Sequence, residues 1–429
     1  MNVAVIGAGY VGLPSAGVFA RLGHNVWLIR RDSDKVEQLK RGEIGIYEPG
    51  LAELVGEGLQ AGRIHPTTSY AEAIPHADVV IICVGTPSGE RGEADLTQVY
   101  DAARSIAPLL SQFTVIVDKS TVPIGTARHV SRLIRERAPS ADFAVASCPE
   151  FLREGSAVED TLNPDRIVIG VDDDRGRERL LLLHDGLPGD RIVTNIENAE
   201  MIKYASNAFL ATKISFMNEI AHICEAVGAD VHEVARGMGA DKRIGQAFLR
   251  AGIGWGGSCF PKDVRALRSI AETHRTDTRI LDAVTAVNQD QRTLVVQKLI
   301  EVLGGLDGKV IYMLGLAFKP HTDDVRESAA IDIIKLLKRE GAVVRAHDPV
   351  AIENARRLLL EAEFVSQVES GFQGADAVVV GTEWQEYQGI SWQEAKRCMR
   401  TPLLIDGRNM LDPKAMRQLG FTYWCVGRP

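Results

Sequence analysis

The sequence predicts an α/β protein with an N-terminal Rossmann domain and a C-terminal Rossmann-like domain, joined by a central region of long helices. Three observations support this fold class. Short apolar runs alternate with helical patterns in the first third of the chain, and a glycine-rich turn follows the first of these runs. The same alternation restarts in the last third, after a helical middle section. We therefore expect domains at residues 1–197, 198–304 and 305–429.

The strands expected in the first domain are short apolar runs bounded by turns, as in buried parallel strands. They lie at Val3–Ile6, Val26–Ile29, Val79–Val84, Thr114–Val117 and Phe143–Ala146. The middle section predicts two long helices, Ala199–Val227 before Gly228 and Thr278–Leu303 before Gly304. In the last domain we expect strands at Lys309–Leu314, Ala342–Ala346 and Ala377–Val380, and a helix at Ser328–Arg339.

Composition restricts the class of protein. The 429 residues are 45% hydrophobic and 25% charged, which is ordinary for a globular chain, and the net charge of -8 argues against a nucleic-acid coat. No apolar run reaches the roughly 20 residues of a membrane helix. The cysteines are dispersed without a Cys-x-x-Cys pair. This pattern favours free thiols in a reducing cytoplasm over disulfides or a metal site.

The glycine-rich turn Gly7-Ala8-Gly9-Tyr10-Val11-Gly12 follows a strand and opens a helix, which is the context of a dinucleotide-binding fingerprint. Gly7 permits the tight turn, Gly9 lets a pyrophosphate approach the backbone, and Gly12 lets helix and strand pack closely. The helix N-terminus stabilises the anion. The alternative is a glycine turn that serves packing alone, and the strand-turn-helix context favours the fingerprint.

The end of the second strand bears on the choice between NAD and NADP. An acid at this point binds the adenosine ribose of NAD, whereas a basic residue suits the 2′-phosphate of NADP. The strand here ends in Arg30-Arg31, and acids follow only at Asp32 and Asp34. Either Arg30 faces a phosphate, or it points to solvent and Asp32 takes the ribose. The residues leave both readings open.

Cys259 is the first candidate for a catalytic nucleophile. A cysteine in an apolar segment is usually a small core residue. Cys259 instead lies in the glycine-rich segment Gly254–Asp263, beside the charged Lys262 and Asp263. A thiolate is the reactive form of cysteine, and a nearby lysine favours it. A thiol beside a hydride acceptor can hold an aldehyde covalently while it is oxidised again.

Other polar residues accompany these motifs. Lys203 and Asn207 lie four residues apart and so share one face of the long helix, where the alternative is a solvated lysine and a surface amide. Glu150 and Glu154 follow a strand, and Thr121 follows another. Ligand sites of α/β sheets lie at such strand ends. Salt-bridged surface acids and an ordinary helix cap are the corresponding alternatives.

Taken together, the motifs resemble those of the UDP-glucose/GDP-mannose dehydrogenase family. The matching segments span nearly the whole chain in family order. They are GAGYVG (7–12), YEPGL (47–51), TP (86–87), STVPIGTA (120–127), PEFLREG (149–155), KYASNAFLATK (203–213), DKRIGQAFLRAGIGWGGSCFPKD (241–263), LGLAFKPHTDDVRES (314–328) and DGR (406–408).

The resemblance implies a four-electron oxidation of a sugar-nucleotide C6 alcohol to a uronate. Two hydrides pass to a nicotinamide cofactor, and the second oxidation proceeds through a thiohemiacetal and a thioester on Cys259. Lys203 is expected to stabilise the oxyanion, and Glu150 to act as base in thioester hydrolysis. Asn207, Thr121 and Asp263 are expected to position the hydroxyl and a water molecule and to assist proton transfer.

The resemblance also implies binding residues. The expected cofactor contacts are Gly7, Gly9, Tyr10, Val11, Gly12, Arg30, Asp32, Lys35, Thr86, Thr121, Glu154 and Arg326. The expected substrate contacts are Phe151, Leu152, Arg153, Glu154, Lys203, Asn207, Arg243, Phe248, Leu249, Gly254, Lys319 and Arg408. Arg243 is expected to reach across a subunit interface, and the long helix to form a homodimer. No metal, nucleic acid or membrane partner is expected.

Two departures qualify the resemblance. The family usually has an acid where this chain has Arg30, so NAD is the expected cofactor with NADP left open. The active-site motifs also occur in both the glucose and mannose branches, and we expect UDP-glucose because Asn163–Gly170 and Tyr47–Leu51 look like the glucose branch. The alternatives are a GDP-mannose or UDP-N-acetylhexosamine 6-dehydrogenase and, in another class, a non-catalytic nucleotide-sugar binding protein.

Overall fold

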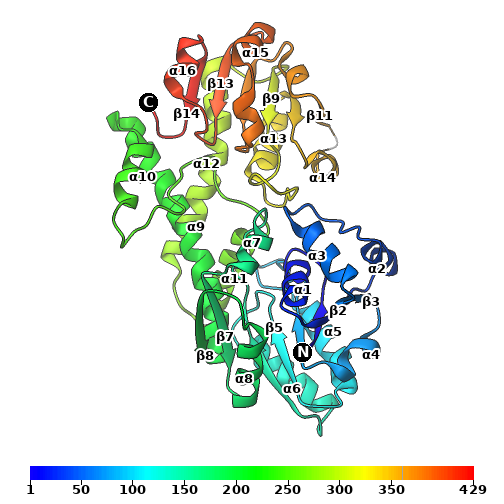
Figure 1. Ribbon diagram of the computed structural model, residues 1–429. Helices are drawn as coiled ribbons and strands as arrows, with labels where there is room; N and C mark the ends of the chain where they lie inside the picture. Colours follow the sequence, from blue (N-terminus) through cyan, green and yellow to red (C-terminus); the bar gives the residue numbers. More distant parts are fainter. Residues whose placement is uncertain (360) are drawn as a thin grey trace. The chain divides into compact units, whose positions relative to one another are not determined.

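The computed structural model describes residues 1–359 and 361–429, and the chain divides into two units. The first unit contains Met1–Ser206 together with Arg265–Arg275, and the second contains Asn207–Val264 together with Thr276–Pro429. Figure 1 shows the elements of both units coloured along the sequence.

The first unit is built on a sheet whose strands are parallel except where β7 pairs antiparallel with β6. In spatial order the strands are β3 (Ile64–Thr67), β2 (Asn25–Ile29), β1 (Asn2–Ile6), β4 (Val79–Ile82), β5 (Thr114–Asp118), β6 (Phe143–Ser147), β7 (Arg166–Val171) and β8 (Asp190–Thr194). The order of the first six is the 3-2-1-4-5-6 arrangement of the Rossmann fold, which has its ligand crevice where the order reverses, between β1 and β4.

Helices cover both faces of this sheet. Alternate residues of β1 enter different cores, because Val3 and Val5 belong to one apolar cluster and Ala4 and Ile6 to another. The helices are α1 (Gly12–Arg21), α2 (Ser33–Lys40), α3 (Leu51–Gln60), α4 (Tyr70–Ala73), α5 (Thr97–Ile106), α6 (Thr126–Arg137), α7 (Ala157–Leu162) and α8 (Asp174–Leu183), with short 3-10 turns at Ile74–His76 and Ala107–Leu109.

The second unit carries a sheet in which each strand pair is parallel. Its spatial order is β11 (Glu363–Phe364), β10 (Val343–His347), β9 (Val310–Leu314), β12 (Ala377–Val380), β13 (Leu403–Asp406) and β14 (Thr422–Cys425). This again is the 3-2-1-4-5-6 arrangement, with its reversal between β9 and β12. The predicted α/β class with two Rossmann-like halves is therefore confirmed.

Helices of the second unit lie before and between these strands in the sequence. They are α10 (Val231–Gly239), α12 (Arg279–Leu303), α13 (Ala329–Arg339), α14 (Ile352–Arg356), α15 (Trp392–Cys398) and α16 (Pro413–Gln418), with 3-10 turns at Val368–Phe372 and Gln385–Gly389. Helices α9 (Ile196–Val227) and α11 (Phe260–Thr273) contain residues of both units. The two long helices end where the sequence predicts, and α9 begins three residues earlier than expected.

Candidate active site

The glycine-rich loop lies at the strand-order reversal of the first unit. Gly7 has a φ of 106°, and a Cβ there would lie 2.4 Å from the Cys83 carbonyl oxygen, at the end of β4. A Cβ on Gly12 would lie 1.9 Å from the Gly7 carbonyl oxygen. A Cβ on Gly9 would meet nothing within 4 Å. The loop is thus closely packed underneath and open at Gly9, which fits a pyrophosphate approaching the N-terminus of α1.

The residues after β2 have partners within the first unit. Arg30 Nη1 donates to the Ala8 carbonyl oxygen of the glycine-rich loop at 3.2 Å. Asp32 Oδ1 caps α2 by accepting from the Asp34 and Lys35 amides at 3.1 and 3.2 Å. One oxygen of the nearest acid is therefore occupied by the helix cap, while the guanidinium of Arg30 is held beside the loop.

Thr86 and Thr121 connect the loops that follow β4 and β5. Thr86 Oγ1 donates to the Thr121 carbonyl oxygen at 2.9 Å, and both residues are buried. Ser120 Oγ donates to the Val84 carbonyl oxygen at 2.8 Å. The hydrogen bonds hold the two loops together beside the glycine-rich loop, which follows the neighbouring strand β1.

Lys203 and Glu150 form a buried ion pair in the first unit. Lys203 Nζ lies 2.9 Å from Glu150 Oε1, and the two side chains are 3% and 7% exposed. Glu150 Oε2 also accepts from the Leu152 amide at 2.8 Å. The ring centroid of Phe151 lies 5.4 Å from Lys203 Nζ. The solvated-lysine alternative for Lys203 is therefore wrong, because this ammonium is held beside a carboxylate and an aromatic face.

Glu48 anchors the loop that carries the expected substrate contacts of this unit, and sequence reasoning assigned it no role. Its buried carboxylate accepts from the Gly155 and Ala157 amides at 2.7 Å each. Arg153 pairs with Asp160 in the same segment, at 2.6 Å, and Glu154 is buried. A single sequence carries no signal that links Glu48 to an amide 107 positions later.

The thiol of Cys259 lies at the start of α11. Its carbonyl oxygen accepts from the Asp263 amide at 2.9 Å, as in the first turn of a helix. The N-terminus of a helix favours negative charge, so this position stabilises a thiolate. Ser258 Oγ lies 3.5 Å from the sulfur. The sequence pointed to Lys262 as the source of stabilising charge, but Lys262 Nζ binds Asp263 at 2.6 Å.

Asn207 and Asp263 also meet within the second unit. Asn207 Nδ2 donates to Asp263 Oδ2 at 2.6 Å, and both side chains are buried. Asp263 thus receives donors from Asn207 on α9 and from Lys262 on α11. The surface-amide alternative for Asn207 is wrong, since the amide is buried against a carboxylate. Lys203 and Asn207, which share a face of α9, pair with different carboxylates.

Arg408 follows β13, and its side chain reaches the strand-order reversal between β9 and β12. Its Nε donates to the Gly381 carbonyl oxygen at 2.8 Å, and its Nη1 to that of Gly254 at 3.2 Å. Its Nη2 donates to the carbonyl oxygen of Phe318, the residue before Lys319, at 3.3 Å. Three predicted substrate contacts, Gly254, Lys319 and Arg408, therefore gather at this edge of the sheet.

The remaining predicted contacts of the second unit differ in burial. Phe248 has a φ of 64°, and its ring centroid lies 6.1 Å from that of Phe260. Leu249 is buried in an apolar cluster with Met217 and Ala221. Arg243 is 89% exposed beside Asp241, at 2.6 Å. Arg326 pairs with Asp324 through Nε and Nη2, at 2.6 Å for Nη2, and its side chain is 57% exposed.

A carboxyl pair under the Thr121 loop was also not anticipated. Asp118, at the end of β5, is 1% exposed, and neither of its oxygens has a hydrogen-bond partner among the described residues. Glu200 accepts from the Gly125 and Ala127 amides at 2.6 and 3.0 Å. Burial, aided by the Glu200 carboxylate, raises the pKa of Asp118 to about 8. Burial likewise raises the pKa of Glu200 to about 7.

We expect the Asp118→Asn variant to be more stable than the wild type at pH 8 by about 1–3 kcal/mol. Because the pKa of Asp118 is raised in the folded state, its contribution to stability is present below the unfolded pKa of 3.8 and is lost as pH rises towards about 8. The urea midpoints of variant and wild type should therefore converge only as pH falls to about 4, near the unfolded pKa. The exposed Glu136→Gln is the control, and parallel pH profiles would contradict a raised pKa.

Among the described helices, none has the combined length and apolar character needed to cross a membrane. Within the same residues, no three His, Cys, Asp or Glu side chains gather as metal ligands would.

Comparison with known proteins identifies the family. The UDP-glucose/GDP-mannose dehydrogenase family matches through its NAD binding domain over residues 1–187, its central domain over residues 197–290 and its UDP binding domain over residues 312–413. These ranges contain the glycine-rich loop, the Cys259 segment and the Arg408 edge, respectively.

Individual relatives agree with this match. The UDP-glucose 6-dehydrogenase of Rhizobium meliloti (strain 1021) is 47% identical over 100% of both chains. The UDP-glucose 6-dehydrogenase TuaD of Bacillus subtilis (strain 168) is 46% identical over 100% of this chain and 93% of its own length. The solved structure of a UDP-glucose dehydrogenase from Pyrobaculum islandicum has a TM-score of 0.93 and 41% identity, covering 98% of this chain and 96% of that one. The chain therefore belongs to the UDP-glucose/GDP-mannose dehydrogenase family.

Proposed function

We propose that the protein is a UDP-glucose 6-dehydrogenase, which oxidises the C6 alcohol of UDP-glucose through the aldehyde to UDP-glucuronate. The observation that carries this proposal is the Cys259 thiol at the N-terminus of α11, in a chain whose full-length relatives bear the name UDP-glucose 6-dehydrogenase. A plain alcohol dehydrogenase or a non-catalytic binding protein has no use for this thiol, so its placement favours the enzyme that oxidises twice.

The roles of the side chains follow from the charges that each step develops. A nicotinamide held by the glycine-rich loop would supply the hydride acceptor for each oxidation. Cys259 Sγ adds to the aldehyde carbon, and the carbonyl electrons move to oxygen, where Lys203 stabilises the negative charge. Loss of a hydride from this thiohemiacetal leaves a thioester. Glu150 then takes a proton from water as the water attacks, and the thiolate leaves.

Asn207, Asp263 and Thr121 complete the proposed catalytic group. The buried Asn207–Asp263 pair offers an amide and a carboxylate that position the C6 hydroxyl and the attacking water. The Thr121 hydroxyl, on the loop tied to Thr86, assists the proton transfers. These assignments rest on the family motifs, with the burial of each side chain in support.

The substrate contacts proposed for the sugar nucleotide come from three segments. They are the loop with Phe151, Leu152, Arg153 and Glu154, the segment from Phe248 and Leu249 to Gly254, and the pair Lys319 and Arg408. The Arg408 guanidinium, fixed by three carbonyl oxygens, is an anchored cation at the edge where a Rossmann sheet binds ligands. We favour UDP-glucose over GDP-mannose or a UDP-N-acetylhexosamine because the relatives named above carry the glucose name.

Residues 1–187 match the family's NAD binding domain, so the cofactor is NAD. We further propose that Arg30 lets the protein accept NADP, because its guanidinium is held at the loop where the ribose end of the cofactor would lie. Replacing Arg30 with Asp should lower kcat/KM for NADP by about tenfold or more relative to NAD, the effect of losing one charge-assisted hydrogen bond. Arg31→Asp is the neighbouring control, and an unchanged NADP-to-NAD ratio would count against Arg30.

The function itself is tested with purified protein, UDP-glucose, and NAD or NADP in parallel. We expect two reduced cofactors for each UDP-glucuronate formed. Turnover with GDP-mannose or a UDP-N-acetylhexosamine but not with UDP-glucose would support the mechanism and contradict the assignment of UDP-glucose as the substrate. No turnover with any of these sugar nucleotides would favour the binding-protein alternative.

We also propose a homodimer formed through α9. Phe209, Phe216, Ile223 and Val227 recur on one side of this helix at helical spacing, and all four are exposed. Exposed apolar stripes of this kind mark protein interfaces. The exposed Arg243 is free of the core and supports the expectation that it reaches a neighbouring subunit.

The free thiols of the six cysteines support a cytoplasmic location. Residues 1–197, 198–304 and 305–429 remain the proposed domains.

A further inference from the structure

Asn288, on α12, holds the backbone of the segment that leads to Cys259. Its Oδ1 accepts from the Trp255 amide at 2.7 Å, and its Nδ2 donates to the Trp255 carbonyl oxygen at 3.0 Å. The amide side chain therefore pairs with both backbone groups of one residue, as a neighbouring strand would. Asn288 is 4% exposed, so water cannot replace these bonds without structural change.

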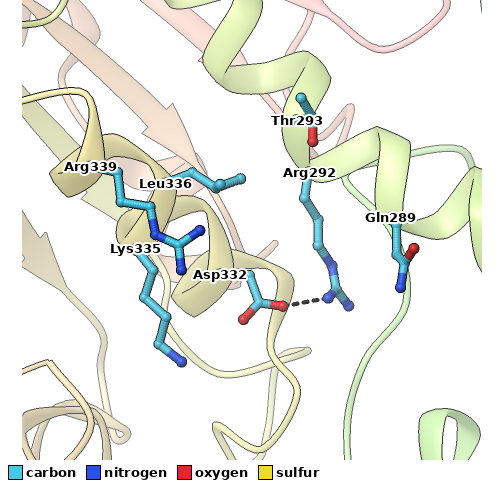
Figure 2. Close-up of a pocket in the computed structure, with 7 residues that line it drawn as sticks. All are labelled: Gln289, Arg292, Thr293, Asp332, Lys335, Leu336 and Arg339. Atoms are coloured by element: carbon cyan, nitrogen blue, oxygen red, sulfur yellow. Dashed lines mark hydrogen bonds and ion pairs between the residues drawn. The ribbon is translucent and has the colours of Figure 1, made fainter.

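Arg292 lies one turn further along α12 and binds the same carbonyl oxygen. Its Nη2 donates to Trp255 O at 3.1 Å, and its Nη1 pairs with Asp332 on α13. Figure 2 shows the guanidinium of Arg292 directed at Asp332, with the dashed ion pair between the two helices. The Trp255 carbonyl thus receives donors from two side chains, one of which is itself fixed by a carboxylate.

The indole of Trp255 is tied as well. Its Nε1 donates to Ser215 Oγ at 2.9 Å, and this hydroxyl donates to the Val284 carbonyl oxygen at 2.8 Å. Two residues later, the Gly257 amide donates to the Arg326 carbonyl oxygen at 3.0 Å. The chain is therefore fixed at Trp255 and Gly257, shortly before Cys259, the residue that precedes the first residue of α11, Phe260.

We propose that Asn288 and Arg292 are positioning residues for the Cys259 thiol, which they hold at the N-terminus of α11 through the backbone of Trp255. This inference rests on the proposed function. The step it concerns is addition of the thiol to the aldehyde: an S–C bond forms as the C=O π bond breaks, the π electrons move to oxygen, and the proton that the thiol gave up ends on that oxygen. The first oxidation of the alcohol does not use the thiol, so it should be affected much less.

The proposal is tested by measuring how much of the aldehyde is oxidised to the acid and how much is released into solution. This ratio is called the partition of the aldehyde below. In the wild type, two reduced cofactors should accompany each acid, and little aldehyde should be trapped by added semicarbazide. In Asn288→Ala we expect trapped aldehyde to rise at least tenfold and reduced cofactor per acid to exceed two. Asn288→Asp keeps the acceptor for the Trp255 amide and loses the donor, so it should lie between the two. A purely structural defect lowers both oxidations together, and an unchanged partition would overturn the proposal.

Arg292 offers a second test, in which a small molecule can replace the lost side chain. The guanidinium borders a cavity of about 230 Å³ that is also lined by Gln289, Thr293, Lys335, Leu336 and Arg339. The Arg292→Ala variant should release aldehyde, as Asn288→Ala does. Guanidinium ion added to the solution should enter this cavity and restore at least part of the yield of acid. Lys335→Ala, which lines the same cavity, is the control. Normal partition in Arg292→Ala would remove Arg292 from the proposal.

Thiol reactivity separates this proposal from the proposed function. The exposed Cys398 provides an internal reference for alkylation by iodoacetamide, followed by mass spectrometry of the two peptides. Without any sugar nucleotide, the Cys259-to-Cys398 rate ratio should change at least threefold in Asn288→Ala and remain constant in Lys335→Ala. A constant ratio in Asn288→Ala would overturn the positioning role even if the wild type oxidises UDP-glucose. A changed ratio in a protein that oxidises no sugar nucleotide would support it and overturn only the proposed function.

Discussion

Replacing Cys259 with serine is expected to lower the rate of UDP-glucuronate formation by at least about 10³-fold, the scale of losing a catalytic nucleophile. A serine hydroxyl is a weak nucleophile at its ordinary pKa, so it should add to the aldehyde far more slowly than a thiolate does. The first oxidation does not need the sulfur. The variant should therefore release the aldehyde, with one reduced cofactor for each trapped aldehyde.

The measurement is the ratio of reduced cofactor to acid and to trapped aldehyde, with UDP-glucose and NAD. Cys398→Ser is the matched control, because Cys398 is an exposed thiol in the same unit and should leave both oxidations unchanged. If Cys259→Ser still formed the acid at a substantial fraction of the wild-type rate, the second oxidation would not require sulfur. It would then proceed through the aldehyde hydrate or through an ester on the introduced hydroxyl.

Local sequence patterns predicted most of the fold. The apolar runs at Val3–Ile6 and Ala377–Val380 became buried strands, because such runs are stable only inside a sheet covered on both faces. Strands β3, β7, β8, β11, β13 and β14 were not predicted. In the edge strand β8, Asp190–Thr194 are partly exposed and the run opens with the charged Asp190 and Arg191, so periodicity gives only a weak signal. The antiparallel pairing of β7 with β6 depends on the path of the chain between them, which no local pattern encodes.

The candidate residues were found by motif, but their partners were not. Position on α9 grouped Lys203 with Asn207, whereas the structure pairs Lys203 with Glu150, 53 positions earlier, and Asn207 with Asp263, 56 positions later. Spacing along one helix shows which side chains share a face, and it carries no information about what packs against that face. The same reason explains why Glu48 and Asn288 received no role from sequence, since each acts on a distant backbone amide.

Replacing Lys203 with methionine is expected to lower the free energy of unfolding by about 3–5 kcal/mol, because it leaves the buried Glu150 carboxylate without its partner. The pair lies at 2.9 Å, with side chains 3% and 7% exposed, so solvent provides little compensation. The variant should also lose at least about 10²-fold in kcat, since the proposed oxyanion loses its cation. Urea denaturation and steady-state kinetics measure the two effects separately.

The double variant Lys203→Met/Glu150→Gln distinguishes stability from chemistry. With both charges removed, most of the lost stability should return, because a neutral amide can keep the hydrogen bond from the Leu152 amide without a buried charge. Activity should not return. The exposed pair Arg21–Glu57 is the control, and Arg21→Met should cost less than about 1 kcal/mol. Recovery of both stability and turnover in the double variant would show that the pair serves folding alone. Recovery of stability without turnover would show that the protein retains a costly buried charge at this position for its chemistry.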